Sequence, residues 1–116
     1  PLIQHSLLAM LEFYHQNKLS LPLLVEKMAH NPATCFQLKD RGYIREGYWA
    51  DLVLVDLNKH HLVKKENLLY KCGWSPFDGK LFNSSIHTTI VNGRVVYNNG
   101  KVIEGDSGMR LEFNRD

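Results

Sequence analysis

The hydrophobic pattern of this 116-residue chain changes its period near residue 40. Before that point apolar side chains recur every three or four residues, which is the spacing of an amphipathic helix. After it they alternate or form short continuous runs, which is typical of strands. This order predicts an α+β fold, with a helical segment over residues 1–40 and a small, mainly antiparallel β domain over residues 41–116.

The helical segment is expected to contain three helices. Ser20 and Asn31 are good N-cap residues. Pro22 and Pro32 follow them in the first helical turn, where the missing N–H costs nothing. Phe36, in the third helix, is expected to point inward. The expected helices cover about residues 2–16, 20–29 and 32–38, and the apolar stripe of the first consists of Leu7, Leu8, Leu11 and Tyr14.

The second half of the chain carries strand and hairpin signals. The run from Asp51 to Asp56 is continuously apolar between two acids, which predicts a strand buried on both faces. Asn92-Gly93 separates two β-branched runs and predicts a tight hairpin turn, and Asn99-Gly100 predicts a second one. The alternating tail over residues 110–113 fits either a last strand or a disordered end.

Composition and charge restrict the classes of binding partner and the cellular compartment that we expect for this chain. The net charge is +2 and the charges are interspersed, so nothing indicates nucleic acid or a membrane surface as a partner. No apolar run approaches the roughly 20 residues that a membrane span needs. Cys35 and Cys72 are too few for a disulfide framework, so we expect a reduced, cytoplasmic protein. No signal peptide follows Pro1, and an opening on Pro1 is compatible with a fragment.

A search for catalytic groups does not complete an active site. The sequence has no His-x-His, His-Glu-x-x-His or Cys-x-x-Cys motif for a metal. Adjacent His60 and His61 point to opposite faces of an extended chain. Cys72 has no evident base or helix N-terminus to activate it, so we expect a buried, inert thiol. Cys35 is expected in the core, and Asp51 is interpreted as a strand-end acid.

Residues 70–79, Tyr-Lys-Cys-Gly-Trp-Ser-Pro-Phe-Asp-Gly, have no regular period and are expected to form a connector. Gly79 permits a turn and Pro76 fixes φ. Trp74 and Phe77 are expected to anchor the loop by burying apolar area.

Several short motifs together resemble the C-terminal part of the amidohydrolase superfamily. Ser75–Gly79 is similar to the Ser-Pro-Phe-x-Gly loop of its cyclic-amide branch, which includes dihydroorotases, allantoinases and dihydropyrimidinases. With the opening Pro-Leu-Ile-Gln-His, the closest resemblance is to the dihydroorotases. The remaining motifs are Asn31-Pro32-Ala33, Gly42, Ile44-Arg45-Glu46-Gly47, Ala50-Asp51-Leu52-Val53 and the hairpin Thr89–Tyr97.

The resemblance implies that these residues are the terminal helices of a (β/α)8 barrel, followed by the C-terminal part of a small β-sandwich built from both chain ends. It also implies one or two zinc ions in the full-length parent, but the motifs that supply their ligands are absent here, so no metal ligand or catalytic residue is expected in this chain. The expected partners are the remaining barrel and the N-terminal sandwich strands. Gln4 or His5 would line the parent's substrate pocket, or would instead serve in helix capping and packing.

Three functions are consistent with this resemblance. The first is a C-terminal piece, inactive alone, of a zinc-dependent dihydroorotase-like enzyme that interconverts dihydroorotate and carbamoyl-aspartate in pyrimidine biosynthesis. The second is a piece of an allantoinase or dihydropyrimidinase (hydantoinase). The third is a non-catalytic assembly or binding module derived from such an enzyme. In isolation, unpaired sheet edges and exposed helix stripes predict self-association.

Overall fold

The computed structural model describes residues 1–115. Their contacts divide the chain into two compact units, each made of two stretches. Unit 1 contains residues 1–20 and 55–85, and unit 2 contains residues 21–54 and those from Ile86 onward. This division does not follow the expected boundary at residue 40, because each helical stretch forms a unit with β residues that follow later in the chain.

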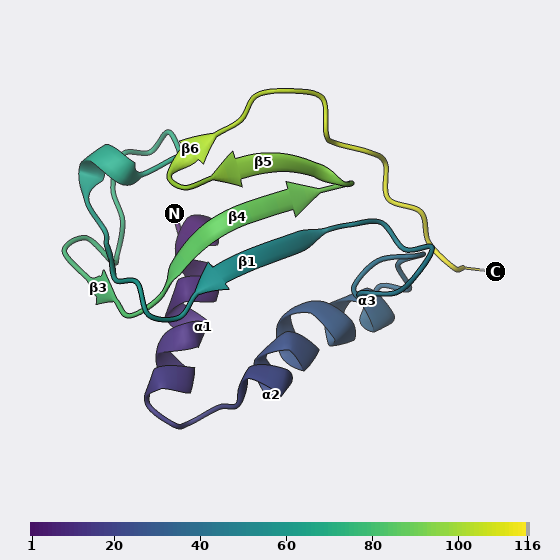
Figure 1. Ribbon diagram of the computed structural model, residues 1–116, viewed down its shortest axis with the longest axis horizontal. Helices are drawn as coiled ribbons and strands as arrows, with labels where there is room; N and C mark the ends of the chain where they lie inside the picture. The colour runs from purple at the N-terminus through teal and green to yellow at the C-terminus, as the bar shows by residue number, and fades with distance from the viewer. Residues whose placement is uncertain (116) are drawn as a thin grey trace. The chain divides into compact units, whose positions relative to one another are not determined.

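Unit 1 combines one helix with a two-stranded ribbon and a long connector (Figure 1). Leu8 and Leu11 bury the inner side of the helix, as the stripe predicts. The ribbon is antiparallel, with His61 opposite Phe82, and Phe82 and Val63 are almost completely buried. The elements are η1 (Ile3–His5), α1 (Ser6–His15), β2 (His61–Leu62), η3 (Lys65–Asn67) and β3 (Leu81–Phe82).

Unit 2 holds most of a four-stranded sheet of order β1-β4-β5-β6, together with a helical run (Figure 1). The expected turns at Asn92-Gly93 and Asn99-Gly100 are confirmed: they join β4 to β5 and β5 to β6 as antiparallel pairs. All four turn residues have positive φ, which asparagine and glycine tolerate best. The strands are β1 (Leu52–Asp56), β4 (Ser85–Val91), β5 (Arg94–Asn98) and β6 (Lys101–Val102).

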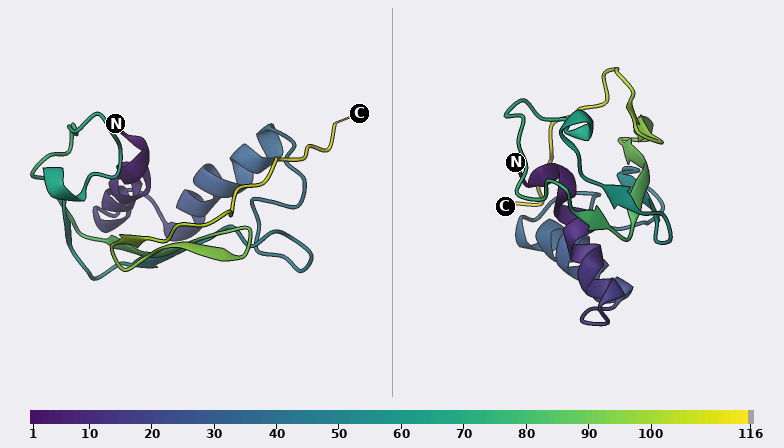
Figure 2. Two further views of the ribbon diagram at one scale, coloured as in Figure 1. Left: turned by 90° about the horizontal axis from the view of Figure 1, so that it is seen from above. Right: turned by 90° about the vertical axis from the view of Figure 1, so that its left-hand side faces the viewer.

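The second and third expected helices are in fact one continuous helical run (Figure 2). It consists of α2 (Leu21–Val25), the π-helix η2 (Glu26–His30) and α3 (Asn31–Cys35). Asn31 has helical φ and ψ, so its expected role as an N-cap is wrong. Pro32 lacks an N–H, and the preceding turn widens so that the Asn31 N–H bonds the Glu26 carbonyl. The expectation that Phe36 points inward is also wrong, because its side chain is 59% exposed after the helix ends.

The strand β1 differs from its expected environment. Val53 is 46% exposed and Leu54 is 48% exposed, although successive residues of a strand point to opposite faces. The prediction that this strand is buried on both faces is therefore wrong for the residues described. β1 lies at one edge of the sheet, and neither of its faces is fully covered.

The C-terminal tail returns along unit 2 (Figure 2). The Ile103 N–H donates to the Val96 carbonyl at 2.8 Å, and Arg94 Nη1 donates to the Asp106 carbonyl at 2.8 Å. Farther on, Phe113 forms an isolated antiparallel bridge with Leu38. Residues 110–113 were expected to form either a last strand or a disordered end. The structure shows neither, because their only pairing is this single bridge.

Gly42 tests the packing of the loop against the helical run. Its φ is +86°, and an added Cβ would overlap the Cβ of Ala33. Gly42→Ala should therefore reduce the free energy of unfolding of the intact protein by about 3 kcal/mol or more, from strain and overpacking together. The measurement is denaturant unfolding.

Gly47→Ala is the matched control, because Gly47 has a φ of +82° but nothing within 4 Å of its added Cβ. In this variant the free energy of unfolding should fall only by the cost of placing alanine at a positive φ, which is about 1–2 kcal/mol. Equal losses in the two variants would contradict the close packing of Gly42 on Ala33.

Candidate functional site

The most enclosed ionisable side chain of unit 1 is that of His5, which has no exposed surface. Four rings surround it, with centroids 6.1 Å (His61, Phe77 and Phe82) or 6.5 Å (Tyr70) from its own. Phe82 is nearly parallel to the imidazole, whereas Tyr70 and Phe77 present their edges. We call these five side chains the ring cluster; their apolar contacts hold the connector against η1.

The polar atoms inside this ring cluster are unpaired. Neither ring nitrogen of His5 has a hydrogen-bond partner among the described residues, and the same is true of the Tyr70 hydroxyl. Burial lowers the pKa of His5 below its usual 6.5, and the neighbouring His61 lowers it further. Burial also lowers the pKa of His61. Both imidazoles are therefore neutral at neutral pH.

The side-chain amide of Gln4 joins η1 to residues 67 and 69, which directly precede the connector of residues 70–79. Its Nε2 donates to the Asn67 carbonyl at 2.9 Å, and the Leu69 N–H donates to its Oε1 at 2.7 Å. Asn67 itself closes η3, because its side chain accepts from the Lys64 N–H at 3.0 Å. In this chain Gln4 and His5 thus both make packing contacts, and the expectation that either lines a substrate pocket stays a prediction.

Two polar contacts join α1 to the residues after β3, and sequence reasoning missed both. The buried Glu12 carboxylate accepts from the Asn83 backbone N–H at 2.6 Å and from its side-chain amide at 3.0 Å. His15 Nε2 is hydrogen-bonded with the Ser84 hydroxyl at 2.7 Å. The available signal was that Glu12 follows Leu8 by four residues, which places it on the buried face of the helix.

The Ser-Pro-Phe-Asp-Gly motif forms a compact turn at the end of the connector. The Ser75 hydroxyl accepts from the Phe77 N–H at 3.0 Å, and the Ser75 carbonyl accepts from the Asp78 N–H at 3.2 Å. Gly79 has a φ of +77°, and its N–H donates to the Val63 carbonyl at 2.9 Å. These bonds present Phe77 to the ring cluster, so the expected anchoring by Phe77 agrees with its contacts.

Other expectations for this connector are wrong. Trp74 is 58% exposed, so it does not anchor the loop within the described residues. Cys72 is an exposed thiol rather than a buried one. Cys35, at the end of α3, is likewise exposed and not part of the core. Residues 71–74 project beyond the turn, and this explains why their apolar character does not lead to burial.

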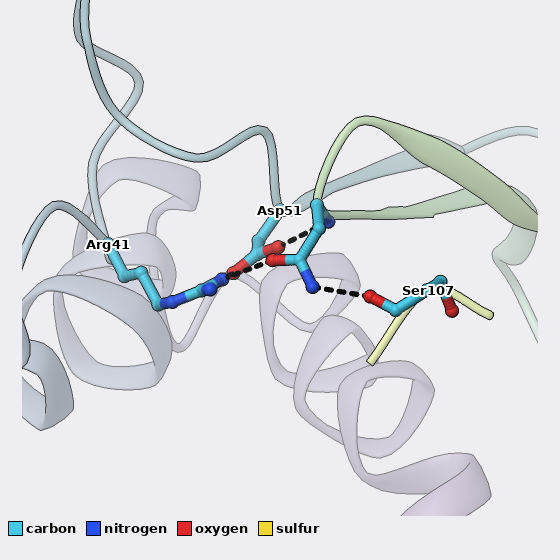
Figure 3. Close-up of polar contacts among 4 residues, drawn as sticks. Arg41, Asp51 and Ser107 are labelled. Atoms are coloured by element: carbon cyan, nitrogen blue, oxygen red, sulfur yellow. Dashed lines mark hydrogen bonds and ion pairs between the residues drawn. The ribbon is translucent and has the colours of Figure 1, made fainter. Parts of the chain in front are cut away.

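The main polar cluster of unit 2 is built on Arg41, whose side chain is 7% exposed (Figure 3). Its Nη1 donates to Asp51 Oδ2 at 2.5 Å and to Asn92 Oδ1 at 2.7 Å. The Asn92 N–H donates to Asp51 Oδ1, and the Asn92 side-chain amide donates to the Ser107 carbonyl (Figure 3). Asp51, interpreted from sequence as a strand-end acid, therefore joins the loop before β1 to the β4–β5 turn and to the tail.

The loop between α3 and β1 is also organised by stacked side chains. His30 Nδ1 donates to the Gly42 carbonyl at 2.7 Å, and its ring stacks on Tyr43 at 4.1 Å. The Arg45 guanidinium lies 4.1 Å from the centre of the same tyrosine ring. Gly47 lies in the turn that follows, with positive φ. Of the motif residues in this loop, Gly42 and Arg45 therefore have packing contacts, whereas Ile44 is 88% exposed.

The described residues do not supply a metal centre. Among residues 1–115 no group of three or more His, Cys, Asp or Glu side chains is placed to hold a metal ion. In the same residues no helix is both long and apolar enough to cross a membrane. The hydrogen bonds of Gln4 and of Arg41 join segments of this chain to one another.

Asp51→Ala tests the cluster around Arg41. The variant leaves a buried guanidinium with the neutral oxygen of Asn92 and the ring of Trp49 but no counter-charge, and we expect a loss of about 2–4 kcal/mol in the free energy of unfolding. The value lies below the upper range for buried pairs because the Asp51 side chain is 36% exposed. Glu112→Ala, which removes the exposed pair with Lys39, should change stability by less than about 1 kcal/mol. Similar losses in the two variants would refute a special role for Asp51.

Known proteins resemble this chain in sequence and in structure. The dihydroorotase of Pyrococcus abyssi (strain GE5 / Orsay) is 32% identical over 111 residues, which are 96% of this chain and 27% of that protein. The allantoinase of Desulfitobacterium hafniense (strain DSM 10664 / DCB-2) is 36% identical over 98 residues, 84% of this chain and 22% of that protein. The L-hydantoinase (dihydropyrimidinase) structure from Arthrobacter aurescens superposes with a TM-score of 0.70 and 33% identity, covering 78% of this chain and 20% of that one.

The chain thus spans 22–27% of the length of these two curated relatives. Residues 2–96 match the model of the amidohydrolase family, a stretch that includes the ring cluster and, of the cluster around Arg41, every residue except Ser107. The chain belongs to the amidohydrolase family.

Proposed function

We propose that this chain is the C-terminal part of a dihydroorotase-like cyclic amidohydrolase. The observation that carries the proposal is the similarity to the dihydroorotase of Pyrococcus abyssi along 96% of the chain. The reaction is the reversible hydrolysis of a ring amide, which interconverts dihydroorotate and carbamoyl-aspartate in pyrimidine biosynthesis. Because the chain covers only 27% of that relative, the activity belongs to a longer polypeptide.

Within that polypeptide the chain would supply structure and not catalytic groups. The contacts that Gln4 and Arg41 make with other segments of this chain support this role, and zinc would be held by residues outside residues 1–115. Gln4 and His5 would fix the connector against η1, as their contacts suggest, which favours packing over direct substrate contact. Both free thiols are exposed, which fits the reducing environment of the cytoplasm.

The remaining part of the polypeptide would cover the apolar surface that this chain leaves exposed. The edge strand β1 presents Val53 and Leu54 on opposite faces, and its outer edge has no partner strand among the described residues. An edge strand of this composition is an aggregation risk unless it is paired or covered. We propose that the other sandwich strands and the barrel are the partners of these surfaces.

A related activity is the alternative that the comparisons also favour. The Desulfitobacterium allantoinase and the Arthrobacter hydantoinase are 36% and 33% identical to this chain, which is as similar as the dihydroorotase. All three activities concern small cyclic amides.

Substrate profiling of the intact, zinc-loaded protein tests the proposal. Turnover of dihydroorotate, and the reverse cyclisation of carbamoyl-aspartate, should exceed turnover of allantoin and of hydantoins by at least about a hundredfold in kcat/KM, or about 2.7 kcal/mol of transition-state discrimination. A preference for allantoin or a hydantoin would replace the proposed substrate but keep the reaction class. The absence of turnover with all of these cyclic amides would favour the non-catalytic module.

The 116-residue chain alone provides the second test. It should show no hydrolysis of dihydroorotate with added zinc, and it should self-associate through the exposed apolar surface. Activity measurement and light scattering check the two expectations. Zinc-dependent turnover by the isolated chain would refute its non-catalytic role, and a monodisperse monomer at high concentration would refute the uncovered surface.

A further inference from the structure

Unit 1 holds a connector whose closure depends on a neutral histidine. The connector segment, defined here as residues 64–80, is fastened near its start by Gln4 and at its end by backbone bonds between Val63 and residues 79 and 80. Between these points, Tyr70 and Phe77 contact His5. The middle of the segment therefore lies against the one imidazole that the structure encloses completely.

We propose that the connector segment is a pH-sensitive clamp, which is closed over neutral His5 and released when His5 takes up a proton. Protonation would place a charge and a second N–H donor among rings where neither His5 nitrogen has a hydrogen-bond partner and where the polar groups, the Tyr70 hydroxyl and the His61 imidazole, carry no negative charge. Cation–π attraction to the phenyl and phenol rings is weaker than the hydration that a buried imidazolium loses. Water reaches the ring only if part of the ring cluster moves away.

Of the groups that enclose His5, the rings of the connector segment are the ones expected to move. His61 and Phe82 are paired opposite each other in the β2–β3 ribbon, and their displacement would break its ladder. Tyr70 and Phe77 belong to the connector segment, where residues 71–74 are exposed and irregular. Opening at these two rings leaves the β2–β3 pairing intact. The Gln4 bonds lie next to His5 in sequence and would weaken in the same step.

No other charged group compensates the proton within the described residues. The only ionisable rings facing His5 are His61 and Tyr70, and His61 is itself made harder to protonate by burial. On α1 the nearest buried carboxylate, Glu12, is bonded to Asn83. The charged side chains on the elements around the ring cluster all point to solvent: Lys64, Lys65, Glu66, Lys71, Asp78 and Lys80.

The direction of the pH dependence follows from the lowered pKa values. In the closed state His5 and His61 bind protons less readily than in the open state, where the usual value of 6.5 applies. Closure is therefore fully favoured above pH 6.5 and weakens as the pH falls below it. The opening equilibrium constant should rise by at most about tenfold per pH unit for each histidine that titrates.

Hydrogen exchange of the intact protein between about pH 8 and about pH 5, with the intrinsic exchange rate corrected, tests the clamp. The amides of Leu69 and Gly79, which are hydrogen-bonded in the closed segment, should lose protection below pH 6.5. The amides of β5 in unit 2 should not change over the same range. Unchanged protection of the segment down to the lowest pH would overturn the proposal.

Two variants distinguish the protonation of His5 from other effects of low pH on the protein. His5→Phe keeps a ring and removes the titrating nitrogens, so the pH dependence of protection in the segment should fall to the part that His61 contributes. His60→Phe alters the exposed neighbour of His61 and should retain the wild-type pH dependence. A His5→Phe protein that still opens in acid like the wild type would overturn the proposal.

If His5→Phe does not fold, nuclear magnetic resonance of the wild-type imidazoles replaces it. The His5 titration should share its midpoint with the loss of protection in the segment. Protonation of His5 without loss of protection would overturn the clamp, as would loss of protection while His5 remains neutral. Both readouts follow the ring cluster alone, and the inference does not depend on which cyclic amide the intact enzyme uses.

Discussion

The guanidinium of Arg41 is the interaction around which unit 2 is organised. A buried charge is stable only when it is paired and hydrogen-bonded, and here the acceptors are Asp51 and Asn92. Because Asn92 also reaches Ser107, a single cation joins the loop after α3, the β4–β5 turn and the C-terminal tail. Segments with little apolar surface of their own are thereby given fixed positions.

In unit 1 some of the buried polar side chains are hydrogen-bonded and others are not. Glu12 accepts two bonds from Asn83, and Gln4 uses both ends of its amide on the connector. His5 is the exception, because its nitrogens are buried without partners. An unpaired buried group has a free-energy cost that packing of the surrounding rings must offset. Such a site is sensitive to any change in its protonation.

The strand β1 has a more apolar sequence than its position in the sheet requires. Val53 and Leu54 belong to a run that is typical of an interior strand, yet they lie on an edge strand and are nearly half exposed. The continuous apolar pattern correctly indicated a strand at residues 52–56 but could not indicate what covers it. The family relationship explains the mismatch, because the relatives are about four times longer than the part that this chain matches.

Local signals predicted local structure well. The Asn-Gly turns, the β4 strand and the stripe on α1 depend on backbone preference and hydrophobic period, and these act over a few residues. The Asn31-Pro32 pair was read as a new helix start, but the chain widens into a π turn and continues. Burial of Phe36, Trp74 and the two cysteines was also misjudged, because apolar character does not say whether a loop has a partner to pack against.

The sequence by itself determined the class of elements, the hairpins and the kinship with the amidohydrolases, because each depends on short contiguous motifs. Only the tertiary structure decided that His5 is enclosed by rings up to 77 residues away in the chain, and that Asp51 pairs with Arg41. Those partners are selected by folding of distant segments against one another. No local pattern records them, since the free energy comes from desolvation and from contacts that exist only after the chain has folded.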